Sequence, residues 1–355
     1  MKKIIFYNFC TLLSLAFLLE FFFFIKAKNT SLFYRNHYDF RKSQPEPYLD
    51  AEYFSKIFIE EWKKHPGGYT EIPNTKIIIP NNFKGKYINV ENNLRVTKFQ
   101  PLQYKNTIHI FGGSTIFGGE IPDENTIPSF LQKKINDSNI SYKVNNYGVS
   151  SIITKQQFER LKNMVEIKKG DIVIFYDGAN DVLQKIYLGN EEGWIVGGNK
   201  EKKFFWIKIL RKISKNSYFF YYIDNKITAA PTIQTNFFNE AIVYSNEISI
   251  AKKYVEEKNA VFYHFLQPVL FEKENKNEYE KKLLTIKSIV PEGLENSFSK
   301  AYPLFKQQLK NNYSHDLTNS FDDTQRSVYL DWCHVNHIGN QIIAEKIFSI
   351  ISLPN

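Results

Sequence analysis

The feature that most constrains the fold of this chain is a short strand-like run that recurs three times and ends each time in a glycine-containing turn. The runs cover residues 107–111, 142–146 and 171–176. The turns place Ser114, Gly148 and Asn180 at intervals of 34 and 32 residues, which is the length of a strand–helix–strand unit. Right-handed crossovers bring the carboxyl ends of such parallel strands to one edge of a sheet. The spacing therefore predicts an α/β protein with three layers, α/β/α, around a central parallel sheet, and it predicts that the three turns meet.

Helix signals fill the intervals between these strands. Asn125 and Thr126 can cap a first helix that runs to about residue 135. Thr154 followed by Gln157 is a capping-box pattern that opens a second helix to about residue 166. The remaining elements are a fourth strand and an amphipathic helix, at residues 260–266 and 341–351.

Ser114 stands in the first turn, in the sequence Gly112-Gly113-Ser114-Thr115. Glycines permit a tight turn and a close backbone approach, and ligands of open α/β sheets bind beyond the carboxyl ends of the strands. A phosphate-binding loop would need Gly-Lys-Ser or Gly-Lys-Thr, which is not present here. Ser114 is therefore a candidate nucleophile, although the same residues also occur in ordinary loops.

A base for this serine is found in Asp331-x-x-His334, just before the final helix. A carboxylate three residues before an imidazole can accept its Nδ1–H and leave Nε2 facing the serine. Two other interpretations exist. Asp331 could be a helix N-cap beside a surface histidine, or His334 and His337 could bind a metal, although no further ligand cluster supports that.

Four blocks now occur in order: Gly-Gly-Ser-Thr, Asn-Tyr-Gly, Gly-Ala-Asn-Asp and Asp-Trp-Cys-His-Val-Asn. Together they resemble the SGNH (GDSL-type) hydrolase superfamily over some 230 residues, up to Ala344, and Gln267-Pro268 resembles a further turn of that family. The resemblance implies a flavodoxin-like α/β/α fold and an esterase reaction. It makes Ser114 the nucleophile, His334 the general base and Asp331 its orienting acid. It also implies an oxyanion hole made by the Ser114 N–H, the Gly148 N–H and the Asn180 side chain.

The first block departs from the family pattern, because Gly113 stands where Gly-Asp-Ser-Leu has an aspartate. The chain there loses a side chain that helps to anchor the nucleophile turn. This departure leaves the substrate class more open than the chemistry.

Residues 4–25 form an apolar segment between Lys2-Lys3 and Lys26. As a helix its 22 residues would rise about 33 Å, enough to cross a bilayer, and no small-x-small cleavage site follows. We therefore expect residues 1–28 to be an uncleaved, single-pass membrane anchor. Five Lys/Arg residues follow it against two before it, which favours a cytoplasmic body, whereas a short tail with a lysine pair favours export. The two signals conflict, and the expectation is an extracytoplasmic (periplasmic) catalytic domain.

The rest of the chain divides into two further parts. Residues 29–105 are irregular and rich in proline and aromatic residues, and we expect a membrane-proximal extension with a helix near 51–63. Residues 106–355 would be the hydrolase domain, with an insertion at 188–236. In that insertion a helix around Trp206 to Lys215 has an apolar face, which would cover the core or act as a membrane-surface lid.

Composition limits the partners. The net charge of +9 suits an anionic surface, either a polysaccharide or lipid headgroups, but scattered lysines equally fit a solvated basic surface. No nucleic-acid motif is recognisable. Cys10 and Cys333 lie in different regions, so neither an internal disulfide nor a cysteine metal site is expected.

These observations predict a membrane-anchored serine esterase that uses no cofactor and no metal. It would remove a short acyl group, such as acetyl, from a small-molecule, carbohydrate or cell-envelope ester. The alternatives are an O-acyltransferase with the same triad and a catalytically inactive, anchored binding module.

Overall fold

The structure is a computed structural model that describes residues 2–28, 68–193, 217, 236–286 and 289–353. The helix expected near 51–63 and the amphipathic helix around Trp206 lie outside these described residues, as does most of the insertion at 188–236.

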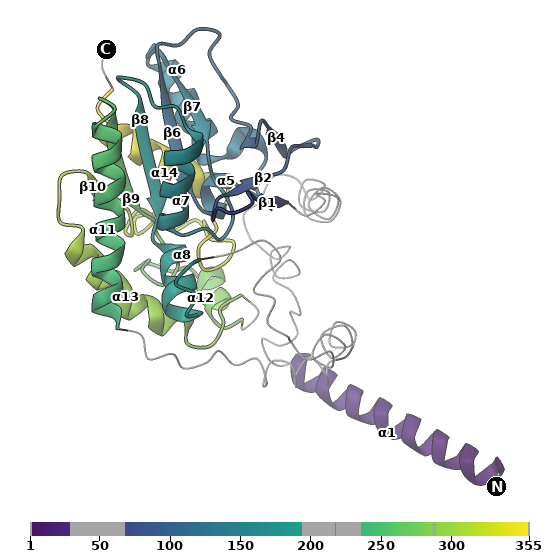
Figure 1. The fold of residues 1–355 in the computed structure, drawn as a ribbon. Helices are drawn as coiled ribbons and strands as arrows, with labels where there is room; N and C mark the ends of the chain where they lie inside the picture. The colour runs from purple at the N-terminus through teal and green to yellow at the C-terminus, as the bar shows by residue number, and fades with distance from the viewer. Residues whose placement is uncertain (1, 29–67, 194–216, 218–235, 287–288, 354–355) are drawn as a thin grey trace.

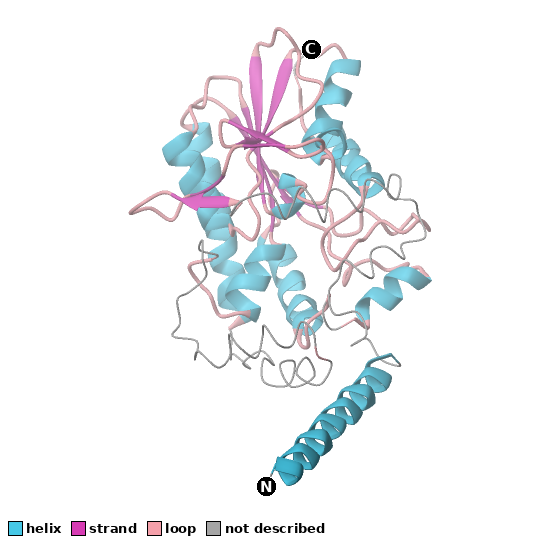
Figure 2. Cartoon of the chain, turned by 90° about the vertical axis from the view of Figure 1, so that its right-hand side faces the viewer, coloured by secondary structure: helices cyan, strands magenta, loops and turns pink. Residues whose placement is uncertain are grey.

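The α/β body is built on an eight-stranded sheet with the order β10-β9-β8-β6-β7-β5-β4-β3. Five neighbouring strands are parallel: β6 (Asn106–Gly112), β7 (Tyr142–Asn146), β8 (Ile172–Asp177), β9 (Val261–Leu266) and β10 (Ser314–Asp316). In chain order the parallel part reads 2-1-3-4-5, the flavodoxin-like order. Helices lie on both sides of the sheet (Figure 2), so the predicted three-layer fold with a mainly parallel sheet is confirmed.

The sheet is buried on both faces, because its central strands alternate between two hydrophobic cores. In β8, Ile172 and Ile174 belong to one core while Val173 and Phe175 belong to the other. The first core is covered by α6 (Ile127–Asp137), α12 (Glu278–Leu284) and α14 (His337–Ile350). The second is covered by α7 (Thr154–Met164), α11 (Phe237–Glu256) and α13 (Leu294–Gln308). A continuous apolar strand is what a parallel sheet between two helix layers requires.

The helix starts partly follow the predicted caps. Thr126 caps α6, since its hydroxyl accepts the N–H of Ser129 at 3.3 Å. The expected capping box at Thr154 is wrong. The N-cap residue of α7 is Ile153, one residue before Thr154, and the Gln156 side chain accepts the N–H of Ile153 at 3.2 Å. Thr154 instead donates its hydroxyl to Asp181 at 3.1 Å.

Before β6 the chain contributes strands of its own. These are β1 (Tyr69–Glu71) and β2 (Ile78–Pro80), which pair with each other, and β3 (Phe83–Lys84), β4 (Asn89–Glu91) and β5 (Leu94–Arg95), which extend the large sheet. β5 joins β7 in antiparallel fashion through the pair Arg95–Asn146. The described part of the predicted extension thus shares a sheet with the predicted hydrolase domain, and the domain division at residue 105 stays a prediction.

Arg95 links this hairpin to the segment that follows the nucleophile turn. Its fully buried guanidinium lies 3.0 Å from the Asp123 carboxylate and donates to the carbonyl of Ile121 at 2.7 Å. Its charge also lies 5.4 Å from the centre of the Phe117 ring. Burial raises the pKa of Asp123, and Arg95 opposes that rise. The pair therefore holds the early strands against the short turns around Ser114.

At the N-terminus, α1 (Lys2–Lys28) is long and apolar enough to cross a membrane. Its candidate span, Tyr7–Ile25, has a mean hydropathy of 2.0, and none of it is buried among the residues that the structure describes. It is the purple helix of Figure 1.

We predict that Arg95→Met lowers the free energy of unfolding of a version without residues 1–28 by about 3–5 kcal/mol at pH 7, because it leaves Asp123 buried without its cation. Urea unfolding measures this. The control is Lys281→Met, which breaks the exposed pair with Glu278 and is expected to cost less than about 1 kcal/mol. Equal losses for the two variants would contradict the structural role of Arg95.

Candidate active site

Ser114 follows the end of β6 as the first residue of α5 (Ser114–Phe117). The turn requires glycine at position 112, because a Cβ there would lie 2.4 Å from Ile116 Cγ1 and 2.7 Å from the Tyr176 carbonyl. Gly118 ends α5 at φ +66°, a conformation that favours glycine. Gly112 and Gly118 therefore shape the turn that places Ser114 at the carboxyl end of a central strand.

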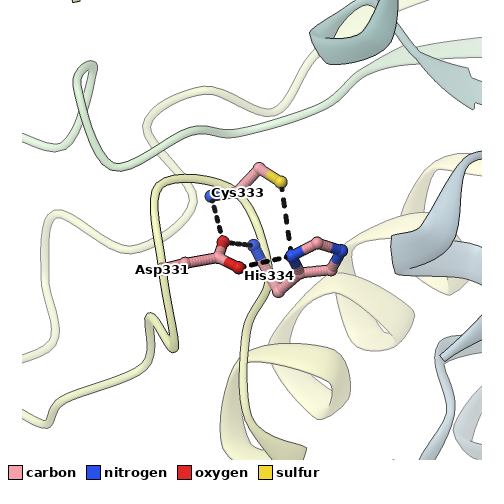
Figure 3. Close-up of side chains that lie close together, drawn as sticks. All are labelled: Asp331, Cys333 and His334. Carbon is pink, nitrogen blue, oxygen red and sulfur yellow. Dashed lines mark hydrogen bonds and ion pairs between the residues drawn. The ribbon is translucent and has the colours of Figure 1, made fainter. Parts of the chain in front are cut away.

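His334 and Asp331 meet this serine from the other end of the sequence. His334 Nε2 lies 2.6 Å from Ser114 Oγ, and His334 Nδ1 lies 2.7 Å from Asp331 Oδ2. Asp331 Oδ1 also accepts the backbone N–H groups of Cys333 and His334, both at 2.8 Å. Figure 3 shows the Asp331 carboxylate inside the turn formed by residues 331–334 and the second ring nitrogen of His334 pointing away from that carboxylate. The three residues form one continuous hydrogen-bonded chain.

The N-cap interpretation of Asp331 is wrong. α14 begins at His337, four residues earlier than expected, because the Asn336 side chain accepts the N–H groups of Ile338 and Gly339, both at 3.1 Å. With Asn336 capping the helix, Asp331 is left to orient the imidazole.

The carboxylate also sets the electrostatics of the imidazole. Burial is the largest influence on the pKa of His334 and lowers it, but the facing Asp331 charge and their hydrogen bond raise the net pKa well above 6.5. A neutral ring holds its proton on Nδ1, where Asp331 accepts it, so Nε2 can take the Ser114 proton. This is the arrangement by which a serine hydroxyl can be activated as a nucleophile.

Asn180 lies beside the same turn, on α8 (Ala179–Asp181) after β8. Its side-chain amide donates to the Ile152 carbonyl at 2.9 Å. A Cβ on Gly113 would lie 2.4 Å from Asn180 Nδ2, so the amide packs directly against the residue before Ser114. One amide hydrogen is engaged, and within the part of the chain that the structure describes the other makes no hydrogen bond.

Gly148 is brought to the same edge, packed against the backbone of α5. A Cβ there would lie 2.2 Å from the Phe117 nitrogen. Its own N–H donates to the Asn146 side chain at 2.9 Å. The structure thus brings the three predicted turns together, with the Gly148 N–H already bonded.

Ser151 is a residue that sequence reasoning missed. It adopts φ +64°, which is rare for a residue other than glycine, between Gly148 and the Ile152 carbonyl that Asn180 binds. Nothing in a serine's identity marks such a conformation.

A small cavity lies beside the nucleophile, lined by Ser114, Gly118, Gly119, Glu120 and His334 among others. Its volume is about 10 Å³, roughly the space of one water molecule. Among the described residues, this cavity adjoins both Ser114 and His334.

Asp331, Cys333 and His334 are close enough to suggest a metal site. Their bonding favours another role, because Nδ1 and the carboxylate are joined to each other. Burial raises the pKa of the Cys333 thiol to about 11, so the thiol carries its proton at neutral pH in the metal-free chain. The expected absence of a metal or cofactor stays a prediction.

No protein-family model and no curated protein matches the chain. Solved structures do. A lipolytic protein of the G-D-S-L family from Veillonella parvula aligns at 11% identity and TM-score 0.41, covering 70% of this chain and 98% of its own. A catalytic mutant of the acetylxylan esterase Axe2 from Geobacillus stearothermophilus aligns at 12% and 0.41, covering 71% and 97%. The acetyl xylan esterase AlAXEase aligns at 16% and 0.37, covering 69% and 100%. The first of these carries the name of the family that the sequence blocks resemble.

We predict that Asp331→Asn lowers the pKa of His334, as followed by NMR of the imidazole protons, because the facing charge is lost. The pKa of His315 is lowered by burial, and its NMR signal serves as the reference that is expected not to move.

The pair of His334 and Asp331 also makes the stability of the fold depend on pH. Because the folded pKa is raised, its stabilisation is fully present below about pH 6.5 and is lost as the pH rises through the folded value. A His334 pKa that is the same in Asp331→Asn as in the wild type would contradict the electrostatic pairing of the two residues.

Proposed function

We propose that this chain is a serine esterase that hydrolyses a short acyl ester, with Ser114 as nucleophile, His334 as general base and Asp331 as the group that orients His334. The observation that carries the proposal is the unbroken chain of two hydrogen bonds, 2.6 Å from Ser114 to His334 and 2.7 Å from His334 to Asp331. Three residues in this order and geometry are the arrangement that acyl transfer through a serine requires.

The reaction follows from these contacts. His334 Nε2 takes the Ser114 proton while Oγ attacks the ester carbonyl carbon, and the carbonyl oxygen becomes an oxyanion. When that intermediate collapses, His334 returns the proton to the leaving alcohol and the acyl group stays on Ser114. A water molecule, deprotonated by His334, then attacks the acyl-enzyme and releases the acid and the free Ser114 hydroxyl.

Two donors are suited to the oxyanion. The Ser114 N–H is the first of α5 and has no partner within that helix, and the Asn180 amide packs beside it. Gly148 was expected as a third donor, and its N–H can serve only after it leaves the Asn146 side chain. Its role stays a prediction.

For the acyl side of the ester we propose a short group such as acetyl, held beside Ser114 where the small cavity lies. The alcohol side of the ester is proposed to be a carbohydrate or a cell-envelope component. A net charge of +9 favours an anionic polymer or membrane surface as the place where the enzyme works.

The first prediction for this function concerns the hydrolysis of acetylated saccharides and nitrophenyl acetate by a version of the protein without residues 1–28. Ser114→Ala and His334→Ala are each expected to abolish hydrolysis, and the double variant is expected to lose no more than either alone. Asn180→Ala is expected to lower kcat by roughly 10²–10³ with little change in KM, because its bond forms mainly in the transition state. A kcat for Ser114→Ala within about tenfold of wild type would reject the proposal.

The same assay separates hydrolysis from transfer, which uses the same triad with a sugar hydroxyl in place of water. Acetate and acetylated sugar are followed by mass with and without an oligosaccharide acceptor. Steady acetate release without acceptor supports the esterase. Product formed only with acceptor would assign an O-acyltransferase, and no turnover of any ester would favour the anchored binding module.

The second prediction concerns the anchor. We propose that α1 holds the catalytic body at a membrane, on its extracytoplasmic side, since its span is apolar and exposed. The full chain is expected to resist carbonate extraction from membranes, and a version without residues 1–28 is expected to be released. A reporter fused after Asn355 reads the sidedness. A mature N-terminus beyond Ala27 would instead identify α1 as a cleaved signal sequence.

A further inference from the structure

The turn that joins β7 to α7, residues 147–153, is tied to both sides of the nucleophile. The Val149 N–H donates to the Gly112 carbonyl at 3.0 Å, two residues before Ser114. The Ile152 carbonyl accepts the Asn180 amide at 2.9 Å, and that amide packs on Gly113. The conformation of this turn therefore determines where the Asn180 amide is held.

Within the turn, Ser151 occupies the left-handed region, at φ +64°. A residue with a Cβ adopts this conformation only when surrounding contacts impose it, and such residues gather at functional sites. Contacts on the neighbours of Ser151 must therefore hold it in place.

One such contact comes from outside the predicted hydrolase domain. Tyr69, in β1, is buried, and its hydroxyl lies 2.7 Å from Ser150 Oγ, with the Ser150 N–H a further 3.4 Å contact. The Tyr69 ring lies 5.8 Å from the Phe117 ring of α5, and its side chain belongs to a small core with Val149 and Ile152. Tyr69 thus touches both the helix of the nucleophile and the turn that bears Ser151.

The state of the hydroxyl suits this role. Burial raises the pKa of Tyr69, so it carries its proton at neutral pH and can share a hydrogen bond with Ser150 in either direction.

We infer that Tyr69 is a positioning residue of the active site: its hydrogen bond to Ser150 holds the strained turn at Ser151 and, through Ile152, the Asn180 amide of the oxyanion hole. The inference rests on the proposed function and extends it to the segment before residue 105. That segment would then be part of the catalytic unit rather than only a tether to the membrane.

The test is Tyr69→Phe in the full chain, which removes one oxygen atom and keeps the ring. The expected result is a fall in kcat of about tenfold or more with KM unchanged, because a small displacement of Asn180 acts on the transition state. Tyr104→Phe is the matched control, since Tyr104 is exposed and its hydroxyl binds Lys143 away from the turn. It is expected to leave kcat unchanged.

Two further variants separate positioning from a general loss of structure. Ser150→Ala breaks the same hydrogen bond from its other side, so its loss is expected to match that of Tyr69→Phe and not to add to it. Ser151→Gly makes the left-handed conformation free of strain, so Tyr69→Phe/Ser151→Gly is expected to recover kcat to within about threefold of wild type. A merely structural role would not give this rescue.

Labelling of Ser114 with a fluorophosphonate keeps the two proposals apart. If wild type is not labelled, the serine-esterase proposal fails and the inference fails with it. If wild type is labelled and Tyr69→Phe keeps its kcat, only the inference is overturned. A Tyr69→Phe loss that Ser151→Gly does not rescue would also overturn it.

Discussion

The pairing of β6 with β7 on one side and β8 on the other is the constraint on which the rest of the site depends. The first strand of the parallel set lies between the second and the third. The connection that leaves β6 towards β7 and the connection that leaves β8 towards β9 therefore run in opposite directions along the sheet. In sheets of this kind the ligand crevice opens where the order reverses, beyond the carboxyl ends of the strands. Ser114 follows β6 and Asn180 follows β8 at that place, so one topological feature juxtaposes the nucleophile and the proposed oxyanion donor.

The base reaches this crevice from the last part of the chain, and a separate set of contacts fixes it. The carbonyl of Trp332 accepts the Leu270 N–H at 2.8 Å, and the Asn336 N–H donates to Val328 at 2.8 Å, which closes the loop around Asp331. A fully buried ion pair of Lys273 and Glu280 supports the same loop, since Glu280 also accepts the Val328 N–H at 3.2 Å. The imidazole is therefore held by backbone contacts as well as by the carboxylate. These contacts let a hydroxyl and a ring that are 220 positions apart in the chain lie 2.6 Å from each other.

The sequence predicted the structure best where a residue type is tied to one backbone geometry, as glycine is to a tight turn after a strand. Glycines after apolar runs at βαβ spacing located Ser114, Gly148 and Asn180 at one sheet edge, and the structure brings them there. It was least informative where the decisive fact is a contact between distant segments or a backbone angle. The bond between Tyr69 and Ser150 joins residues 81 positions apart, and the left-handed angle of Ser151 leaves no trace in its side chain. The short antiparallel strands β3 to β5 were missed for a different reason, because strands of two or three residues carry no periodicity.

Gly113 shows how one departure from a family pattern follows from its surroundings. Judged from the sequence, the missing aspartate side chain weakens the anchoring of the nucleophile turn. In the structure, Asn180 Nδ2 stands 2.4 Å from where a Cβ on Gly113 would be, so the amide occupies the space next to that position. A side chain at residue 113 would displace either the amide or the turn, and real Cβ contacts do not become that short. The anchoring that the aspartate would supply comes from other contacts. The Thr115 hydroxyl donates to the Gln267 side chain at 3.2 Å, the Asn146 amide donates to the Ile116 carbonyl at 2.8 Å, and the Val149 N–H donates to the Gly112 carbonyl at 3.0 Å. Glycine at position 113 thus leaves room for the Asn180 amide next to Ser114. The turn that we infer Tyr69 holds fixes the same amide through the Ile152 carbonyl.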